Sequence, residues 1–251
     1  MDSPDRFTAY HEALEARHLA KLTFAEVRRA LQALSSVYVE RRGRMAEGAV
    51  FDGAGKRAAF ALYYGPMHFL LVREIVRALG LRAPRRILDL GCGTGTAGAA
   101  WALECEPRAR VDGVDRSGWA AAEARWTFAR LGVDGRATRA DAVAAPLPGP
   151  PAGVLAAFTV NELAEEPRRR LLARLVEAAR MGSTALVVEP IARRVSPWWP
   201  EWAEAVRAAG GREDEWRFRP DLPDRLALLG RAAGLDSREL TGRSLLLPPG
   251  L

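Results

Sequence analysis

Residues that commonly bind metal ions are scarce in this sequence. Its 251 residues include two cysteines, Cys92 and Cys105, and three histidines, His11, His18 and His68. The cysteines form neither a metal-ligand spacing nor a disulfide framework, and no spacing groups the histidines with cysteines or carboxylates. We therefore expect no metal site, and we interpret Cys92 as a small residue that fits inside a glycine loop.

Long apolar runs are also absent. No stretch of about 18 apolar residues could span a membrane, and no basic segment followed by an apolar one suggests a signal peptide. With 49% hydrophobic and 27% charged residues, the composition is that of a folded protein with one large domain or a domain and an appendage. We expect a cytoplasmic protein without a membrane partner. The sequence leaves the oligomeric state open.

Lysine is nearly missing, because 35 of the 37 basic residues are arginine. The net charge of +6 arises in residues 1–86, which hold 15 basic and 9 acidic residues. Such an excess could form a surface for a polyanion. Acidic residues such as Glu12, Glu15 and Glu26 are interspersed with the basic ones, however, and this favours an ordinary solvated helical surface.

The first part of the chain, residues 1–83, is predicted to be a helical region. Helices are expected at 5–20 and 23–42, the second starting with the capping-box spacing of Thr23 and Glu26. A further helical segment, 58–79, should be interrupted at Gly65-Pro66, since proline cannot continue the preceding hydrogen-bond ladder. This segment carries Tyr64 and His68, which belong either to the core or to a ligand cleft.

A strand, a tight loop and a helix are predicted over residues 86–101. The apolar run before Asp89 is followed by Gly91, Gly93 and Gly95 at alternate positions and then by an Ala-rich segment. Glycines at such a junction allow a sharp turn and a close approach of a ligand to the backbone. The loop is therefore a candidate nucleotide-type site.

Strands and helices alternate after residue 86, which predicts an α/β domain with a parallel sheet covered on both faces. Further strands are expected at 110–115, 136–141, 153–160 and 184–188, and a closing hairpin at 237–241 and 244–247. We assign residues 84–251 to this domain. A Trp-rich insert at about 190–223 forms either a substrate cover or a seal along the sheet edge.

Acidic residues stand at the ends of successive predicted strands. Asp115 follows the second strand, 20 residues beyond Gly95, and Asp141 follows the third. A carboxylate at the first position can accept both hydroxyls of a ribose, and one at the second can accept an adenine amino group. With Asp89 and the glycines, these acids would lie on the edge where open parallel sheets bind ligands.

The segment Ile-Leu-Asp-Leu-Gly-Cys-Gly-Thr-Gly (residues 87–95) resembles the first motif of class I S-adenosylmethionine-dependent methyltransferases, and Gly113-Val-Asp115 and Ala140-Asp141 resemble the second and third. The resemblance implies a Rossmann-like, doubly wound sheet of seven strands with the last one antiparallel. It implies S-adenosylmethionine as cofactor, bound by Asp89, Gly91, Cys92, Gly93, Gly95, Asp115, Arg116, Asp141, Ala142 and Thr159. A nicotinamide dehydrogenase is disfavoured, because its third glycine usually comes one residue later.

A narrower similarity concerns Gly-Thr-Ala with Trp101, Asn161-Glu162-Leu163 and Val188-Glu189-Pro190. These segments look like those of methyltransferase-like proteins associated with the mitochondrial small ribosomal subunit. The present chain departs from that family because it lacks the cysteine-rich region expected after the Glu-Pro strand.

The acceptor side is less sharply defined by the sequence. We expect Tyr64, His68, Asn161, Glu162, Trp198 and Trp199 to contact the substrate, with Glu162 or His68 as a catalytic base if one is used. Glu189 is either a substrate contact or a buried structural carboxylate that caps a helix. The predicted function is methyl transfer to a small molecule. The alternatives are an RNA- or ribosome-directed enzyme or small-subunit assembly factor, and a cofactor-binding protein without catalysis.

Overall fold

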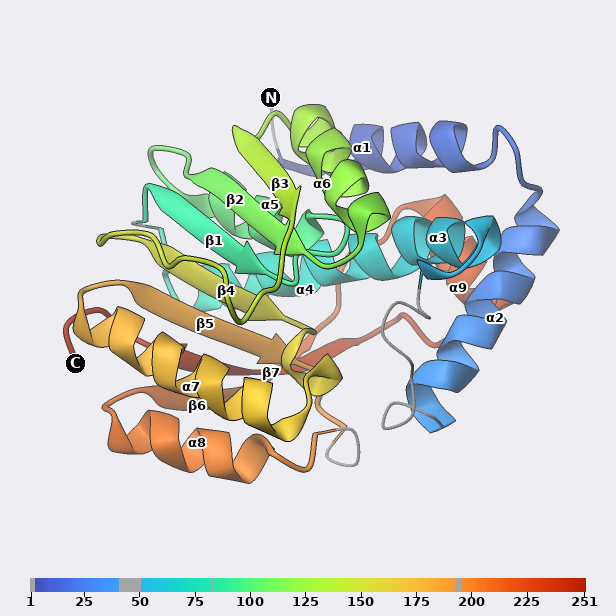
Figure 1. Ribbon diagram of the computed structural model, residues 1–251. Coiled ribbons are helices and arrows are strands. Elements are labelled where there is room, and N and C mark those ends of the chain that lie inside the picture. The colour runs from blue at the N-terminus through green and yellow to red at the C-terminus, as the bar shows by residue number, and fades with distance from the viewer. Residues whose placement is uncertain (1–2, 41–50, 83, 193–195) are drawn as a thin grey trace.

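The computed structural model describes residues 3–40, 51–82, 84–192 and 196–251. In these residues seven strands form a single sheet in the order β3-β2-β1-β4-β5-β7-β6 (Figure 1). Strand β7 is antiparallel to both β5 and β6, and the other pairs are parallel. The strands are β1 (Arg86–Leu90), β2 (Arg110–Asp115), β3 (Gly135–Arg139), β4 (Gly153–Ala157), β5 (Thr184–Glu189), β6 (Arg212–Phe218) and β7 (Leu240–Leu247). The predicted doubly wound fold with an antiparallel last strand is confirmed.

Both faces of the sheet are buried, as expected for parallel strands between two helical layers. Alternate residues of one strand belong to different cores: Ile87 of β1 packs on one side, and Leu88 and Leu90 on the other. The first side is covered by α4 (Gly65–Ala78), α5 (Thr96–Glu104) and α6 (Gly118–Leu131), and the second by α7 (Glu165–Arg180) and α8 (Trp199–Ala208) (Figure 1).

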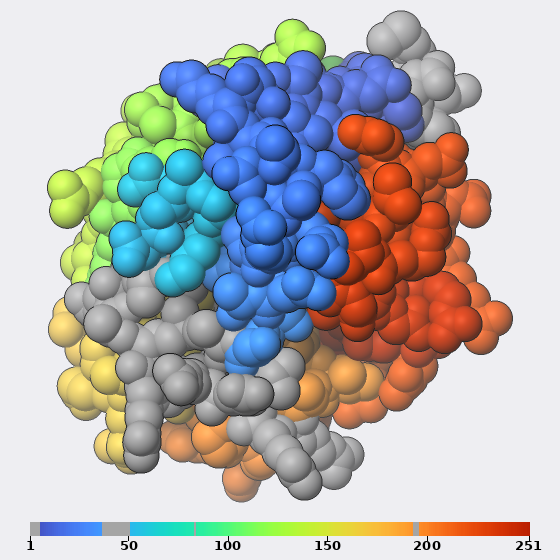
Figure 2. All heavy atoms as spheres, turned by 90° about the vertical axis from the view of Figure 1, so that its right-hand side faces the viewer, coloured from blue at the N-terminus to red at the C-terminus, as the bar shows by residue number. Residues whose placement is uncertain are grey.

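The N-terminal helix α1 (Ser3–His18) runs alongside α6, and α2 (Phe24–Glu40) lies beyond the carboxyl ends of the strands (Figure 1). Figure 2 shows them covering this side of the molecule, between α3 (Ala54–Ala59) and the C-terminal α9 (Asp224–Ala232). Their buried residues, including Tyr10 and Leu31, belong to the same core as the first face of the sheet. The helical region is therefore packed onto the α/β unit, and the division at residue 83 stays a prediction.

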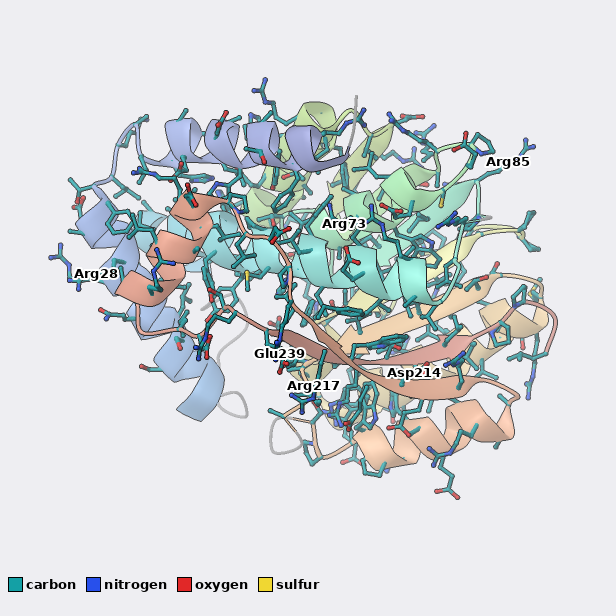
Figure 3. The ribbon with its side chains drawn as sticks, turned by 180° about the vertical axis from the view of Figure 1, so that it is seen from behind. Arg28, Arg73, Arg85, Asp214, Arg217 and Glu239 are labelled. Atoms are coloured by element: carbon teal, nitrogen blue, oxygen red, sulfur yellow. The ribbon has the colours of Figure 1, made fainter. Side chains whose placement is uncertain are left out.

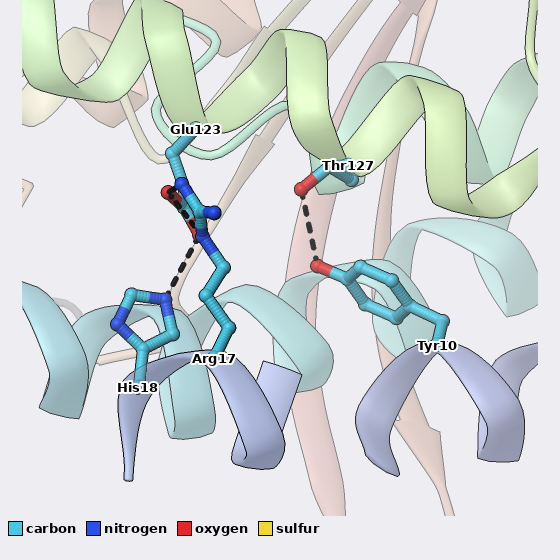
Figure 4. A network of polar contacts seen from close by, with 5 residues as sticks. All are labelled: Tyr10, Arg17, His18, Glu123 and Thr127. Carbon is cyan, nitrogen blue, oxygen red and sulfur yellow. Dashed lines mark hydrogen bonds and ion pairs between the residues drawn. The ribbon is translucent and has the colours of Figure 1, made fainter. Parts of the chain in front are cut away.

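Helix α1 is held on α6 by a buried polar network (Figure 4). Glu123 is 2% exposed and accepts hydrogen bonds from Arg17 Nη2 at 3.1 Å and from His18 Nε2 at 2.9 Å. Tyr10 and Thr127 form a second hydrogen bond at 3.3 Å. Burial alone would raise the pKa of Glu123, but the bonds from His18 and Arg17 lower it, so this carboxylate stays charged in the fold.

The expected interruption at Gly65-Pro66 is wrong, because the helix continues through the proline. Helix α3 passes directly into a π-helical segment, η3 (Phe60–Tyr64), and then into α4, which has Pro66 in its first turn. A proline in the first turn needs no N–H partner. The carbonyl of Leu62, four residues before Pro66, accepts a hydrogen bond from the buried side chain of His11.

The C-terminal part differs from the expected hairpin. Residues 240–247 form one strand, β7, and its hairpin-like partner is β6, for which no strand was predicted. Strand β6 is an edge strand whose sequence, Arg-Glu-Asp-Glu-Trp-Arg-Phe, is mostly charged. Charged side chains are common on edge strands because they discourage pairing with other chains, and they conceal the strand pattern. Arg217 of β6 pairs with Glu239 at 3.0 Å (Figure 3).

None of the described helices is long and apolar enough to cross a membrane.

Candidate functional site

A cavity of about 1290 Å³ lies at the carboxyl ends of β1 to β4. Its position is where ligands bind in open parallel sheets, since the chain leaves β1 and β4 in opposite directions across the sheet. Both the α/β unit and the N-terminal region line it. The predicted site residues in its wall are Tyr64, His68, Asp89, Gly91, Cys92, Gly93, Asp115, Arg116, Asp141, Ala142, Thr159, Asn161 and Glu162.

The glycine loop after β1 requires glycine for two separate reasons. Gly91, Gly93 and Gly95 have φ of 69°, 52° and 78°, in the left-handed region that other residues rarely adopt. A Cβ at Gly91 would also lie 2.4 Å from Thr159 Cγ2. A Cβ at Gly93 would meet nothing closer than the ring of Phe60 at 3.6 Å, so this part of the loop is open.

Gly95 has a different position from the one expected. It caps the N-terminus of α5, and a Cβ there would lie 2.8 Å from Phe128 and 2.9 Å from Ala124 of α6. Its backbone therefore faces the neighbouring helix, and it is not among the residues that line the cavity.

Asp115 connects the end of β2 to the glycine loop. Its Oδ2 accepts the backbone N–H of Gly93 at 2.9 Å, and its Oδ1 accepts that of Ser117 at 2.8 Å. Burial raises the pKa of Asp115, against the effect of these two bonds. Each oxygen keeps one further lone pair, so the carboxylate can still accept two hydroxyl groups from the cavity.

Asp141, after β3, is held by Arg116 and by its own loop. Arg116 Nη2 lies 2.6 Å from Asp141 Oδ2, and the N–H of Val143 donates to Oδ1 at 2.7 Å. Burial would raise the pKa of Asp141, but these contacts lower it. The side chain remains 41% exposed, so it is ionised at neutral pH and open to a ligand.

Asp89 is buried beneath the loop. Its Oδ2 accepts the backbone N–H of Gly98 in α5 at 3.0 Å, and a Cβ at Gly98 would collide with that oxygen at 2.7 Å. Burial, with a smaller contribution from the charge of Asp115, raises the pKa of Asp89 to about 7. Burial also raises the pKa of the Cys92 thiol, which agrees with its interpretation as a small, unreactive residue.

Comparison with known proteins identifies this part of the chain. A family model described as a methyltransferase domain matches residues 87–182. The fold is similar to that of a putative O-methyltransferase from Nostoc punctiforme, with a TM-score of 0.55 and 15% identity over 92% of this chain and 71% of the other. Residues 87–182 thus match a methyltransferase domain. The plantazolicin methyltransferase, solved with a desmethyl substrate analogue and SAH, has a TM-score of 0.53 at 12% identity, covering 90% of this chain and 97% of that one.

The methyltransferase domain also has a curated relative. Ribosomal RNA large subunit methyltransferase G of Streptomyces avermitilis is 42% identical over 95 residues, which are 38% of this chain. The match spans 23% of that relative's length. The similarity is therefore confined to this domain, and about three quarters of the relative has no counterpart in the match. The narrower similarity to mitochondrial ribosome-associated proteins stays a prediction.

The residues of the cavity fit S-adenosylmethionine, the cofactor that the resemblance to methyltransferases implies. The open backbone at Gly93 leaves room for a ligand, and Asp115 keeps acceptor capacity for the two hydroxyls of a ribose. Within the described residues, no group of three or more His, Cys, Asp or Glu is arranged to hold a metal ion.

On the other side of β1, the end of β4 is fastened to the glycine loop by Thr159. Its hydroxyl lies 3.0 Å from the carbonyl oxygen of Leu90 and 3.2 Å from that of Gly91. The preceding residue, Phe158, has φ of 58°, which is rare for a bulky side chain. Its ring lines the cavity and stacks on His68, with 3.7 Å between ring centroids.

Of the two alternatives for Glu189, a substrate contact or a buried structural carboxylate, the structure favours the second. Glu189 is fully buried at the end of β5, and its Oε1 accepts the N–H of Val160 at 2.9 Å, at the start of the 3₁₀ turn η4 (Val160–Glu162). Its Oε2 accepts the side-chain amide of Asn161 at 2.5 Å. Asn161 Oδ1 in turn accepts hydrogen bonds from Ser196 and Trp198. Asn161 thus joins three segments as well as lining the cavity.

Trp198 and Trp199 lie outside the cavity wall, contrary to the expected substrate contact. They are 6% and 3% exposed and pack with Trp202 in the core between α8 and the sheet. Trp216 belongs to β6 and donates to Ser244 of β7 at 2.8 Å. The tryptophans of this segment are therefore packed against the sheet, which agrees with the interpretation of the segment as a seal along the sheet edge.

The cavity also contains residues that the sequence did not indicate. Phe51 and Trp119 pack with 4.9 Å between ring centroids, and Arg57 lies 5.7 Å from the Trp119 ring. Trp119 follows the Ser117 cap of α6, while Phe51 and Arg57 belong to the N-terminal region. A local pattern could have suggested Trp119, because it lies close behind the Asp115 motif. Nothing local distinguishes Phe51 or Arg57.

Proposed function

We propose that the protein transfers a methyl group from S-adenosylmethionine to a small-molecule acceptor. The observation that carries this proposal is the continuity of the cavity, in which the cofactor motif shares one space with Tyr64, His68, Asn161 and Glu162. Ligand pockets usually measure about 300–1,000 Å³. A cavity of about 1290 Å³ has room for a nucleoside cofactor together with a second small molecule.

The order of the strands supports a division of this space. Asp115, Arg116 and Asp141 follow β2 and β3, on one side of β1, and we assign them to the ribose and adenine. Phe158, Asn161 and Glu162 follow β4, on the other side of β1. The methionine end would lie along Gly91 and Gly93 between the two halves. The transferred methyl would then face the β4 half.

Bound S-adenosylmethionine supplies a methyl group on a positively charged sulfur. The acceptor oxygen or nitrogen would take this methyl, and the electron pair of the broken bond would stay on sulfur. The acceptor's proton passes to a base. We assign this role to His68, which is half-buried in the cavity, with the exposed Glu162 as the second candidate. Orientation can supply about 7–11 kcal/mol of the barrier, and a base about 10²- to 10⁴-fold in rate.

Formation of S-adenosylhomocysteine tests this function. The protein and S-adenosylmethionine are incubated either with the small-molecule fraction of a bacterial extract or with its purified RNA. We expect product above background with the small molecules and none with RNA. Product with RNA alone would replace the proposal by its alternative.

That alternative is an RNA- or ribosome-directed methyltransferase or a small-subunit assembly factor. The similarity of the domain to a ribosomal RNA methyltransferase favours it. The excess of basic residues in the N-terminal region would supply the contacts to phosphate. Binding of RNA should then fall steeply with added salt, because each phosphate contact releases counterions.

A further inference from the structure

The half of the cavity that follows β4 has an aromatic wall, formed by Phe60, Tyr64, His68 and Phe158. The ring of His68 is nearly parallel to that of Phe158, at 12° and 3.7 Å. Tyr64 lies 5.9 Å from Phe60 and 6.2 Å from His68, measured between centroids. All four side chains line the cavity. Four aromatic rings therefore border the space that we assign to the acceptor.

Phe158 adopts a strained backbone to reach this wall. A left-handed conformation is strained for a bulky residue and persists only where the surroundings enforce it. Here the N–H of Phe158 donates to the carbonyl of Val188 at 2.8 Å. The hydroxyl of the next residue, Thr159, donates to the carbonyl of Leu90. Strain of this kind is concentrated at functional sites, where it holds a side chain in a required position.

Two of the three described arginines that line the cavity, Arg116 and Arg139, lie at the ends of β2 and β3, on the other side of β1. Arg116 pairs with Asp141, Arg139 donates to the carbonyl of Arg116 at 3.0 Å, and Arg57 lies beside Trp119. Among the residues that the structure describes, the segment that follows β4 contributes no arginine or lysine to the cavity wall. Recognition of phosphate relies on such cations or on converging N–H groups. The aromatic wall lacks the first of these.

We infer that the methyl acceptor is a planar aromatic or heteroaromatic molecule without phosphate, which stacks on the wall formed by Phe158, His68, Tyr64 and Phe60. The inference rests on the proposed function and specifies its substrate class. Stacking would place a nucleophilic O–H or N–H at the molecule's edge toward the glycine loop. The wall thus selects the acceptor by shape and ring character.

Three probes of related shape test this selection on protein saturated with S-adenosylhomocysteine. They are 1-naphthol, its fully saturated counterpart decahydro-1-naphthol, and 1-naphthyl phosphate, with binding measured by calorimetry or ligand-observed NMR. We expect 1-naphthol to bind at least about tenfold more tightly than either of the others. Equal affinity for the saturated alcohol, or tighter binding of the phosphate, would overturn the inference.

A pair of variants locates the effect. Phe158→Leu keeps an apolar side chain but removes the ring, so the affinity for 1-naphthol should fall about twofold to tenfold, the range of one aromatic contact. The matched control is Phe218→Leu, on β6, where the ring stacks on Trp216; it should leave the affinity unchanged.

Binding of S-adenosylhomocysteine separates the possible failures. If it does not bind to the wild type, the proposed function fails. If it binds normally to both variants but Phe158→Leu holds 1-naphthol as well as the wild type does, the aromatic acceptor is wrong while the methyltransferase function stands.

Discussion

The backbone N–H of Gly93 lies 2.9 Å from Oδ2 of Asp115. The acid that ends β2 thus fixes the loop that follows β1, so the two motifs are joined by a hydrogen bond before any ligand binds. A change at Asp115 should therefore affect both the proposed contact to ribose and the shape of the loop.

Replacing Asp115 by alanine should weaken S-adenosylmethionine binding by at least about tenfold. Hydrogen bonds to charged groups contribute about 1.5–3 kcal/mol each, and a tenfold change corresponds to about 1.4 kcal/mol. Calorimetry measures the affinity, with the exposed Asp134→Ala as a control for the loss of one negative charge. Equal affinities of the two variants would contradict the assignment of Asp115.

Gly91→Ala should lower the free energy of unfolding by about 2–5 kcal/mol. The new Cβ would combine left-handed strain with an overlap at Thr159. Urea unfolding measures this, and Gly149→Ala is the control because a Cβ there meets nothing within 4 Å. Adding Thr159→Ala should recover part of the loss, whereas strictly additive effects would show that the overlap is not responsible.

Asp89 should make stability depend on pH. Its pKa is 3.8 in a model peptide and about 7 in the fold, so between these values the folded protein retains a proton that the unfolded chain releases. Raising the pH from about 4 to 7 therefore lowers the free energy of unfolding, by an amount on the order of 4 kcal/mol. Asp89→Asn removes this contribution.

Urea unfolding at several pH values compares the wild type with Asp89→Asn. The difference between their unfolding free energies should change across the window from pH 4 to 7 and become constant above it. Parallel curves throughout would show that Asp89 ionises as easily in the fold as in the unfolded chain.

Glu123→Gln should loosen α1 from α6. The amide cannot replace the charged hydrogen bonds to Arg17 and His18, and we expect a loss of about 2 kcal/mol in unfolding free energy. Because the pKa of Glu123 is lowered, its contribution in the wild type is complete above pH 4.5 and is lost as the pH falls below that value.

Limited trypsin digestion reports the release of α1 directly. Cleavage after Arg17 should become faster in Glu123→Gln and remain unchanged in Glu177→Gln, which alters an exposed position on α7. The same cleavage rate in both variants and the wild type would mean that the network does not hold the helix.

The effects of substitutions on kcat distinguish His68 from Glu162 as the catalytic base. With an acceptor found through S-adenosylhomocysteine formation, His68→Asn should lower kcat by about 10²- to 10⁴-fold, and Glu162→Gln by less than tenfold. The affinity for S-adenosylmethionine should stay within about twofold in both. The opposite order would transfer the role to Glu162.

The sequence pointed to the residues around the glycine loop that line the cavity because their signals are local. Gly91, Gly93 and Asp89 stand within one strand and loop, and Asp115 ends the short strand Arg-Val-Asp-Gly-Val-Asp. The acceptor side depends on tertiary contacts. The left-handed backbone of Phe158 is imposed by its neighbours, and Phe51 reaches the cavity from the N-terminal region.

The same distinction applies to the fold. The buried strands β1, β2, β4 and β5 have clear patterns, whereas β6 is an edge strand whose charges conceal it. Pro66 predicted a break, but a proline is tolerated in the first turn of α4. The tryptophans at 198 and 199 suggested a ligand surface, although their position between α8 and the sheet is one that large apolar side chains ordinarily take.

The π-helical segment η3 contains one residue more than an α-helical turn would need. In an α-helix each residue advances the chain by 100°, so deletion of one residue between Phe60 and Tyr64 would rotate α3 by that angle relative to α4. Arg57 would then turn away from Trp119, while His68 would stay where it is. A single inserted residue thus allows Arg57 of α3 and His68 of α4 to face the same cavity from one continuous helix.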